Sequence, residues 1–540
     1  MRVPLEWLRE FVDFKMSPEE TAHILTMIGF EVEAIESVNG DYVFEVNVTP
    51  NRPDCLSILG IARELAAACK VSYHIPEHNV LAEMVALGFN VDIDDIALCH
   101  RYAGRIIHNV KIAPSPEWMK KRLEKCGIRS INNVVDISNY VLLELGHPLH
   151  AFDLNMLKGG RIIVGTPNKI KGPGAKVKIT TLDAIEREVP DDTLLIWDAE
   201  KPIAIAGVMG GEFSGVTEKT VDIFIESAYF EPASVRKTSK LLDLKTESSY
   251  RFERGSDIKI LKKALDRAAF LVKEIAGGEI HGKVDIYPKS YKPEEITISC
   301  GKINRILGIN LKILEITDCL HRLGLEIEGS GDTLRIKPPA YRRDLRIDAD
   351  IIEEVARIYG YDNIPAALPK ATVGIDTADA AKKTDSLKKR NEIKELLLKA
   401  GFTEAINYSF IGSHDLDILS VSDNDQRRDM INIINPLKSE DSCMRTFIMP
   451  SLIRNMVHNI SHGVKELRLF ETANVFLCRQ GSGGERICEL PHEKNQCAVL
   501  LYKEKIKTLY KEETHDFYLI KGLLESLFSD FRIRDYGFVR

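Results

Sequence analysis

The stretch AYRRDLRIDADIIEEVARIYGYDNIP, residues 340–365, decides how the rest of this chain is organised. Just before it, Pro338 and Pro339 end a short strand, because proline cannot continue a hydrogen-bonded ladder. The spacing of the apolar residues then predicts a helix over 348–359 with one buried stripe. Gly360 ends this helix, since glycine adopts the left-handed conformation after a helix at low cost.

Acidic side chains gather on this helix and just before it. Three of them are spaced so that they share the face opposite the apolar stripe, and a fourth lies upstream. These acids are Asp344, Asp350, Glu353 and Glu354. Four carboxylates that meet need a counter-charge, which Mg²⁺, a basic partner surface or the nearby Arg342, Arg343 and Arg346 could supply. The alternative is a solvated acidic face beside surface arginines, which is the usual fate of charge runs on helices.

The composition is that of an ordinary globular protein. The 540 residues are too many for one core and predict three or four domains. No apolar run approaches the ~20 residues of a membrane span, and the acidic, amphipathic first residues do not resemble a signal peptide. The net charge of −7 excludes a wholly basic nucleic-acid binder. Ten cysteines without a CxxC pair indicate reduced thiols and a cytoplasmic protein.

Several long motifs agree in their order along the chain. They are TPNRPDCLSILGIARE at residues 49–64, GHPLHAFD at 146–153, KTESSYRFERG at 245–255 and ELRLFETANVF at 466–476. Together with the acidic-helix stretch, these motifs resemble the β subunit of phenylalanyl-tRNA synthetase over nearly all of residues 1–540. The resemblance rests on the residues of these motifs and their order, and not on composition or periodicity.

The resemblance implies an α+β, multidomain fold in four parts. These are a helix-helix-strand module over 1–40, a core with an editing module over 41–290, a winged-helix-like module with the acidic helix over 291–365, and a catalytic-like module with a degenerate class II synthetase-like antiparallel sheet over 366–540. The tRNA-binding insert of bacterial relatives is absent, because only residues 38–41 join the strands that would flank it. The chain stops before the family's anticodon-binding domain, as a naturally short form or as a fragment.

The editing module of this family hydrolyses tyrosine wrongly attached to phenylalanine tRNA. A buried group that hydrogen-bonds the extra hydroxyl can discriminate by ~10⁴ or more, because phenylalanine would leave that group unpaired. By motif match, the hydroxyl reader falls on Glu226, which the sequence places at the end of an apolar strand. His150 is implied to position the hydrolytic water, and Thr246 and Ala206 are implied to line the pocket.

Each of these residues also has an ordinary structural interpretation. A lone histidine such as His150 is more often a hydrogen-bonded core residue. A carboxylate such as Glu226 more often pairs with a nearby arginine, here Arg236 or Arg251. A threonine before a helix, such as Thr246, is more often an N-cap.

Two residues depart from the family pattern. Ser248 stands where the family usually has alanine at the pocket wall, and Tyr250 stands where histidine is common. A serine at the wall adds polarity and could narrow or retune the pocket. The sequence alone therefore does not decide whether the chain retains editing.

The resemblance implies a β subunit that works with an α subunit in an (αβ)₂ heterotetramer and binds tRNA(Phe), away from any membrane. The α subunit would attach phenylalanine with ATP, and the acids at 344–354 would share Mg²⁺ with it. No class II catalytic residues are evident, so we expect no charging of tRNA by this chain alone. Two alternatives remain: a free-standing hydrolase of mischarged tRNA, and a non-catalytic scaffold that has lost editing.

Overall fold

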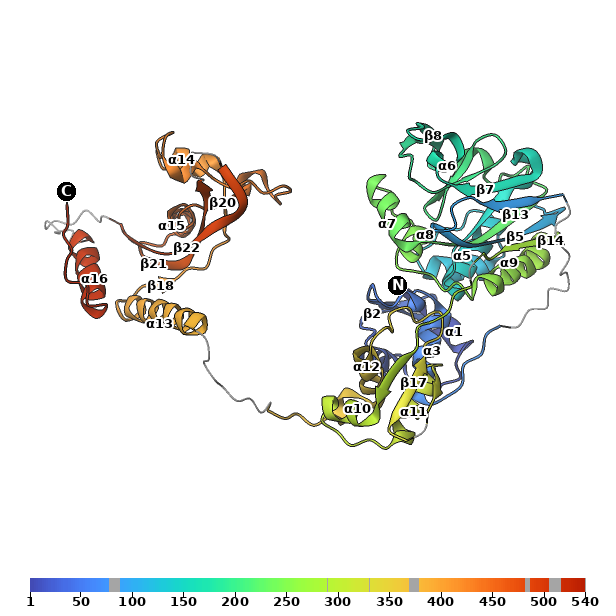
Figure 1. The fold of residues 1–540 in the computed structure, drawn as a ribbon, viewed down its shortest axis with the longest axis horizontal. Coiled ribbons are helices and arrows are strands. Elements are labelled where there is room, and N and C mark those ends of the chain that lie inside the picture. Colours follow the sequence, from blue (N-terminus) through green and yellow to red (C-terminus); the bar gives the residue numbers. More distant parts are fainter. Residues whose placement is uncertain are drawn as a thin grey trace. The chain divides into compact units, whose positions relative to one another are not determined.

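The computed structural model describes residues 1–76, 88–288, 290–329, 331–368, 378–480, 486–504 and 516–539. The chain divides into two units, Met1–Leu368 and Pro369–Arg540, and each is described by itself (Figure 1). This division lies close to the boundary predicted after residue 365. Most of the predicted linker at 366–380 lies outside the described residues.

The first unit begins with a three-stranded antiparallel sheet of order β1-β3-β2. Its elements are β1 (Arg2–Pro4), α1 (Leu5–Arg9), α2 (Pro18–Met27), β2 (Val32–Val38) and β3 (Asp41–Val46). Ser17 and Glu20 form a capping box at the start of α2. Because β3 is the central strand, the boundary predicted at residue 40 falls inside this sheet and does not separate two domains.

A second antiparallel sheet, of order β14-β5-β13-β6, forms the centre of the unit. It contains β5 (Cys99–His108), β6 (Leu149–Asp153), β13 (Ile223–Phe230) and β14 (Glu279–Ile286). Helices cover one face: α5 (Asn133–Leu145) and α9 (Leu261–Ala276) pack against it, while α3 (Ile58–Cys69) and α4 (Glu117–Lys125) pack on α5 (Figure 1). Ile223 and Ile225 point into this helical core.

The other face of the central sheet packs on a sheet of short strands. This sheet has the order β12-β11-β10-β7-β4, with β4 (Asn90–Ile93), β7 (Arg161–Gly165), β10 (Leu195–Trp197), β11 (Pro202–Ile205) and β12 (Met209–Gly210). Only the β4–β7 pair is parallel in this sheet. Tyr102, Phe152 and Phe224 pack in the core between the sheets. Since side chains alternate along a strand, Glu226 and His150 share that face.

The remaining elements of this region border the two sheets. They are η2 (Leu154–Met156), η3 (Lys158–Gly160), α6 (Pro167–Lys171), the hairpin of β8 (Val177–Thr180) and β9 (Glu186–Val189), η4 (Glu212–Ser214), α7 (Pro232–Leu241) and α8 (Glu247–Phe252). The 3-10 turn η1 (Pro53–Cys55) lies at the start of α3.

Residues 296–363 form the last part of the first unit. Their order is β15 (Ile296–Ser299), α10 (Cys300–Leu307), α11 (Ile313–Arg322), β16 (Glu326–Glu328), β17 (Thr333–Lys337), α12 (Asp348–Tyr359) and η5 (Tyr361–Asn363). The strands pair in the order β15-β17-β16. The helix predicted from the opening stretch has the bounds of α12, with Ile351 and Val355 fully buried on its apolar side.

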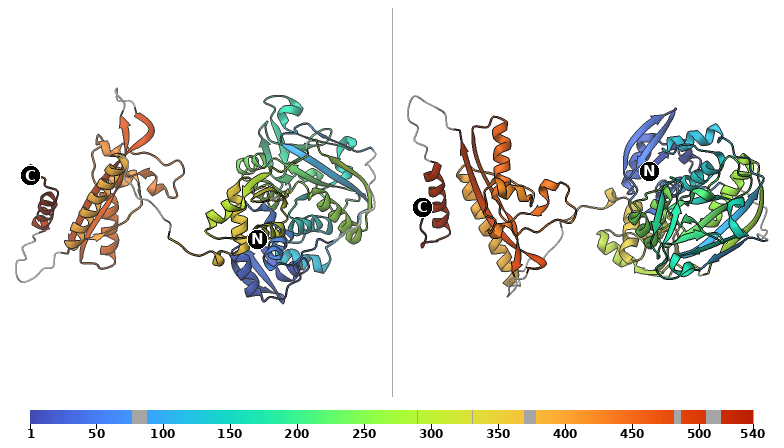
Figure 2. Two further views of the ribbon diagram at one scale, coloured as in Figure 1. Left: turned by 60° about the horizontal axis from the view of Figure 1, so that its bottom comes forward. Right: turned by 90° about the horizontal axis from the view of Figure 1, so that it is seen from above.

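The second unit is built on a long hairpin of β21 (Glu466–Gln480) and β22 (Arg486–Lys503). The short β18 (Thr403–Glu404) pairs parallel to β21. Its helices are α13 (Ala378–Lys399), α14 (Ser413–Ile418), α15 (Met449–Ser461) and α16 (Asp516–Asp530). Leu452 of α15 shares a buried cluster with Leu469 of β21, and Leu397 of α13 shares another with Phe470. Because these two neighbouring β21 residues point in opposite directions, the two helices cover opposite faces of the hairpin (Figure 2).

Apolar residues alternate with polar ones over residues 406–410, which predicts a strand, and this prediction is wrong. Residues 406–409 are not in a strand, and only β19 (Phe410–Ile411) pairs, with β20 (Cys443–Met444). The side chains of Ile406 and Tyr408 are almost fully exposed. The apolar side chains whose alternation predicted a half-buried strand therefore point outward in this unit. The described helices include none that is long and apolar enough to cross a membrane.

Candidate functional site

Glu226 and His150 are direct neighbours on two paired strands. Glu226 of β13 faces His150 of β6 on one side and Gly104 of β5 on the other. The prediction that Glu226 ends a strand is wrong: it lies in the middle of β13, which continues through Phe230. The strand continues because the residues after Glu226 are small or apolar and pair with β5 along their whole length.

The two side chains line one small cavity of about 50 Å³, room for a few water molecules. It is lined by Pro148, Leu149, His150, Ile196, Ala204, Ile205, Gly207, Val208, Met209, Gly210, Glu226, Ser248 and Phe252. The motifs around residues 150, 226 and 248 thus meet at one place. Ala206 is buried between two lining residues but is not itself part of the lining.

Thr246 is the N-cap of α8, as its structural interpretation predicted. Its Oγ1 accepts a hydrogen bond from the Ser249 backbone N–H at 3.0 Å and donates one to the Val208 carbonyl at 2.8 Å. Val208 lines the cavity, whereas Thr246 does not. Thr246 therefore shapes the cavity by holding the loop between β11 and β12 to the start of α8.

The carboxyl group of Glu226 is buried and forms no ion pair among the residues that the structure describes. Burial raises its pKa to about 7, against the opposing effect of the Tyr102 hydroxyl, which donates to Oε2 at 2.6 Å. The arginine pairing considered from the sequence is not formed by Arg251, which donates to the Leu56 carbonyl and to Glu247. Tyr102 was not found by motif matching. Its alternation with Ile106 on β5 is the signal that places it on the face of Glu226.

The side chain of His150 is half-buried and forms no ion pair within the described residues. Burial lowers its pKa to about 4, so the imidazole is neutral at pH 7. Its ring lies edge-on to Phe152, with the centroids 4.5 Å apart. The ring atom Nε2 is buried and has no hydrogen-bond partner among the described residues. Such a group can accept a hydrogen bond from a water molecule that enters the cavity.

The glycine-rich turn at 207–211 makes room for this histidine. A Cβ at Gly210 would lie 2.5 Å from His150 Cε1 and 2.6 Å from Nε2. A Cβ at the neighbouring Gly211 would lie 2.5 Å from the Ile203 carbonyl oxygen. The turn therefore packs on His150 at Gly210 and packs tightly against another backbone segment at Gly211.

The acidic helix α12 presents a different kind of carboxylate. Glu354 is buried, and its Oε2 accepts hydrogen bonds from Arg342 Nη1 and Arg357 Nη2, both at 2.6 Å. Burial opposes ionisation, but the two guanidinium groups outweigh it and lower the pKa of Glu354. Arg357 also donates to Glu64 of α3 at 2.6 Å. The expectation that Glu354 shares an exposed face with the other acids is therefore wrong.

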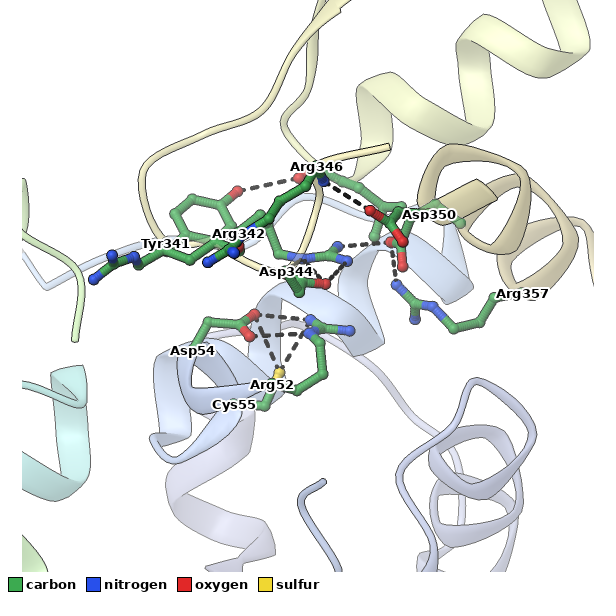
Figure 3. Close-up of polar contacts among 12 residues, drawn as sticks. Arg52, Asp54, Cys55, Tyr341, Arg342, Asp344, Arg346, Asp350 and Arg357 are labelled. Carbon is green, nitrogen blue, oxygen red and sulfur yellow. Dashed lines mark hydrogen bonds and ion pairs between the residues drawn. The ribbon is translucent and has the colours of Figure 1, made fainter. Parts of the chain in front are cut away.

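This network continues into the motif at residues 49–64 (Figure 3). Arg52 donates to both oxygens of Asp54, at 2.9 and 2.8 Å, and forms an ion pair with Glu64. Three side chains in this network lie close enough together to hold a metal ion by distance alone: Asp54, Cys55 and Glu64. The guanidinium groups of Arg52 and Arg357 already neutralise this group, so its role is to join α3 to α12.

The other three acids lie beside a wider cavity of about 700 Å³. Asp344 accepts hydrogen bonds from Arg342, at 2.7 Å to Oδ2 and 3.0 Å to Oδ1. Asp350 Oδ2 accepts from the backbone N–H groups of Arg346 and Ile347. Glu353 is exposed. Within the described residues, the ligand oxygens of these four acids do not come together as one group, so they do not fit a four-acid magnesium site within this chain.

Comparison with known sequences places three family domains along the chain. Sequence models match the B3/4 domain at residues 98–277, the tRNA synthetase B5 domain at 296–361 and the phenylalanyl tRNA synthetase beta chain CLM domain at 364–540. The chain is 40% identical over 513 residues to the phenylalanine–tRNA ligase beta subunit of Syntrophotalea carbinolica, covering 93% of this chain and 61% of that protein. The corresponding protein of Syntrophus aciditrophicus is 42% identical over 502 residues, covering 91% and 60%.

The chain thus spans about three fifths of the length of these relatives. Among solved structures, an N-terminal fragment of the phenylalanyl-tRNA synthetase beta subunit from Pyrococcus horikoshii is 17% identical, with a TM-score of 0.40, and covers 66% of this chain and 99% of the fragment.

Proposed function

This chain belongs to the family of phenylalanine–tRNA ligase beta subunits, and from that premise we propose that it acts as the beta subunit of such a ligase. The observation that carries this proposal is the match to relatives of one name over more than nine tenths of the chain. The partner would be an alpha subunit in an (αβ)₂ assembly that uses ATP and Mg²⁺ to attach phenylalanine to tRNA(Phe) in the cytoplasm.

We further propose that the cavity between Glu226 and His150 hydrolyses tyrosine from mischarged tRNA. A phenol hydroxyl that enters the cavity would donate a hydrogen bond to the Glu226 carboxylate. Phenylalanine would leave that buried carboxylate without the bond, which penalises its binding. A phenol ring is larger than the space for a few waters, so the substrate has to widen the cavity next to Ser248 and the loop at Val208.

The reaction adds water to the ester carbonyl carbon and breaks its bond to the terminal ribose oxygen of the tRNA. The water proton is transferred as the ribose hydroxyl leaves. His150 is neutral at pH 7, so it can accept a hydrogen bond from the attacking water and hold it in line. Gly210 leaves room for the imidazole ring in this position, because a side chain there would displace it. Ser248 adds a hydroxyl to the same wall, and a polar wall suits a substrate that carries one more hydroxyl than phenylalanine.

The test is the release of tyrosine from tyrosyl-tRNA(Phe). It compares the complex with the alpha subunit, this chain alone, and complexes that carry Glu226→Ala or Glu226→Gln. We expect the complex to hydrolyse the ester and each variant to lose about ten- to hundredfold in rate with tyrosine, the worth of one hydrogen bond to a charged group. Glu279→Gln, an exposed carboxylate on β14 of the same sheet, is the matched control and should retain the rate.

The outcomes separate the alternatives. Hydrolysis by the chain alone at the rate of the complex would favour a free-standing hydrolase. Normal assembly without hydrolysis would leave a scaffold subunit in which Glu226 and His150 are structural. A loss in Glu279→Gln equal to that in Glu226→Gln would contradict the assignment of the hydroxyl reader.

For magnesium we propose a smaller role than the motif implies. Asp344, Asp350 and Glu353 line one cavity, and only Glu353 is exposed, so it is the acid best able to meet a metal held by the alpha subunit. Glu354 is unsuited, because releasing it would leave Arg342 and Arg357 buried without a counter-charge. Calorimetric titration of the assembled complex with Mg²⁺ tests this: Glu353→Ala should weaken binding, and unchanged binding would remove magnesium from this helix.

A further inference from the structure

A separate cavity of about 420 Å³ lies where three segments of the first unit meet. They are α3 with the chain that follows it, the start of α9 with the turn before it, and residues 324–341 around β16 and β17; Pro293 completes the lining. The cavity is lined by Arg63, Tyr73, Ile75, Asp257, Lys259, Ile260, Lys263, Pro293, Gly324, Glu326, Lys337, Pro338, Pro339, Ala340 and Tyr341. Its volume is within the range of small-ligand sites, and it shares no lining residue with the cavity of Glu226.

Positive charge exceeds negative charge in this lining. The basic residues are Arg63, Lys259, Lys263 and Lys337, and the acidic residues are Asp257 and Glu326. Lys337 pairs with Glu326 at 3.6 Å. Within the described part of the chain, neither Lys259 nor Lys263 forms an ion pair. Burial raises the pKa of Asp257, and the nearby Arg63 and Lys259 oppose that shift. The lining therefore favours an anion.

Arg63 is held in a geometry that suits an oxyanion. Its guanidinium carbon lies 4.1 Å from the centroid of the Tyr341 ring, which fixes the plane of the group. Its Nε is buried and has no hydrogen-bond acceptor among the residues that the structure describes. A Cβ at Gly324 would lie 2.6 Å from the Tyr341 hydroxyl, so the glycine leaves room for the ring beneath Arg63. The Nη groups of this planar guanidinium are the donors that suit phosphate oxygens, since Arg63 lines the cavity.

We propose that this cavity is a binding site for a phosphate group. The N–H groups of Arg63 donate to two phosphate oxygens, and Lys259 and Lys263 balance the remaining charge. Nothing in the family assignment requires this site, and the proposal does not depend on editing. The phosphate can belong to a free diphosphate or to the backbone of an RNA strand, and the experiment distinguishes the two.

The experiment titrates the full chain with inorganic pyrophosphate and, separately, with a short oligouridine. Binding is measured by calorimetry at two salt concentrations. Lys259→Ala and Lys263→Ala change exposed side chains and should each weaken binding about two- to fivefold. Arg63→Lys keeps the charge but loses the planar guanidinium group with its paired N–H donors, and should weaken binding about tenfold. Lys273→Ala, an exposed lysine on α9 outside the cavity, is the matched control.

Two further variants have the opposite expected sign. Glu326→Gln and Asp257→Asn remove negative charge from the lining and keep the size of each side chain, so each should tighten binding about two- to fivefold. Tighter binding of pyrophosphate than of RNA identifies a free anion, and the reverse identifies a strand. No saturable binding of either probe, or a loss in Lys273→Ala as large as in Lys259→Ala and Lys263→Ala, would overturn the proposal.

Discussion

Glu226 and Glu354 are two buried glutamates of the same unit with opposite surroundings. Glu354 is 3% exposed and has two guanidinium groups at 2.6 Å, while Glu226 is 6% exposed and accepts a hydrogen bond from the phenol of Tyr102. Burial acts on both, yet the pKa of Glu354 is lowered and that of Glu226 is raised to about 7. The partner, and not the burial, decides whether a carboxylate is a fixed ion or a group that titrates near neutrality.

The largest effect is expected when the fixed ion is removed. Glu354→Gln leaves Arg342 and Arg357 buried with less counter-charge, and breaking such a pair costs about 3–5 kcal/mol. All three tryptophans, Trp7, Trp118 and Trp197, lie in the first unit, so tryptophan fluorescence during urea unfolding reports that unit alone.

The control for this variant lies one residue away on the same helix. Glu353 is exposed, so Glu353→Gln should change the free energy of unfolding by less than about 0.5 kcal/mol. Equal losses in Glu353→Gln and Glu354→Gln would show that the buried network contributes no more than the exposed face of α12.

The second prediction uses pH to distinguish the two glutamates. The pKa of Glu226 rises from 4.5 to about 7 on folding, so the folded state binds the extra proton between these values. Stability therefore falls as pH rises from 4.5 to 7, by about 3 kcal/mol at 1.36 kcal/mol per pH unit. Glu226→Gln should abolish this loss, so the variant becomes more stable than the wild type above pH 7.

The measurement is the free energy of unfolding at several pH values for the wild type and Glu226→Gln. The difference between the two chains should be smallest near pH 4.5 and should grow toward pH 7. His150 contributes in the opposite direction, because its pKa falls to about 4 on folding and stability is lost as pH drops from 6.5. That contribution is present in both chains and cancels. A pH-independent difference would mean that Glu226 is ionised in the folded protein at all these pH values.

Local signals in the sequence marked several of the helices, but not α7 or α14. The capping pair Ser17 and Glu20 marks the start of α2, and Asn132 caps α5. The short strands of the β12-β11-β10-β7-β4 sheet could not be assigned in detail, because strands of two to five residues carry too little alternation.

The candidate site was only half visible in the sequence. The motifs identified Glu226 and His150 as candidate site residues. The contact between Tyr102 and Glu226, in contrast, depends on strand pairing across 124 positions of sequence, which no local pattern encodes. The misplacement of Glu354 had a visible signal. It lies three residues after Ile351 and four before Ile358, so it belongs to the buried stripe of α12 and not to the face of Glu353.

The third prediction concerns the space over His150. Gly210→Ala places a Cβ within 2.6 Å of the imidazole ring, which must move, and overpacking of this kind costs about 1–3 kcal/mol. The displaced ring should also lower tyrosine release by the complex. Gly301→Ala is the control: its Cβ would come no closer than 3.6 Å to another group, and alanine favours the helix α10 in which it lies. A Gly210→Ala chain as stable and active as the wild type would show that the ring is free to move.

The smallest effect is expected at Tyr102. Tyr102→Phe removes the hydroxyl that donates to Glu226 at 2.6 Å and leaves the burial of the carboxyl unchanged, so the pKa of Glu226 should rise further. The lost hydrogen bond should cost about 1 kcal/mol where Glu226 is protonated and about 2 kcal/mol where it is ionised, since bonds to charged groups are stronger. The cost should therefore grow from pH 5 to pH 8, and this growth should vanish when Glu226→Gln is also present. Tyr42→Phe, an exposed tyrosine of β3, should have no effect at either pH. A cost for Tyr102→Phe that is the same at both pH values would mean that the hydroxyl only fills space beside Glu226 and does not tune it.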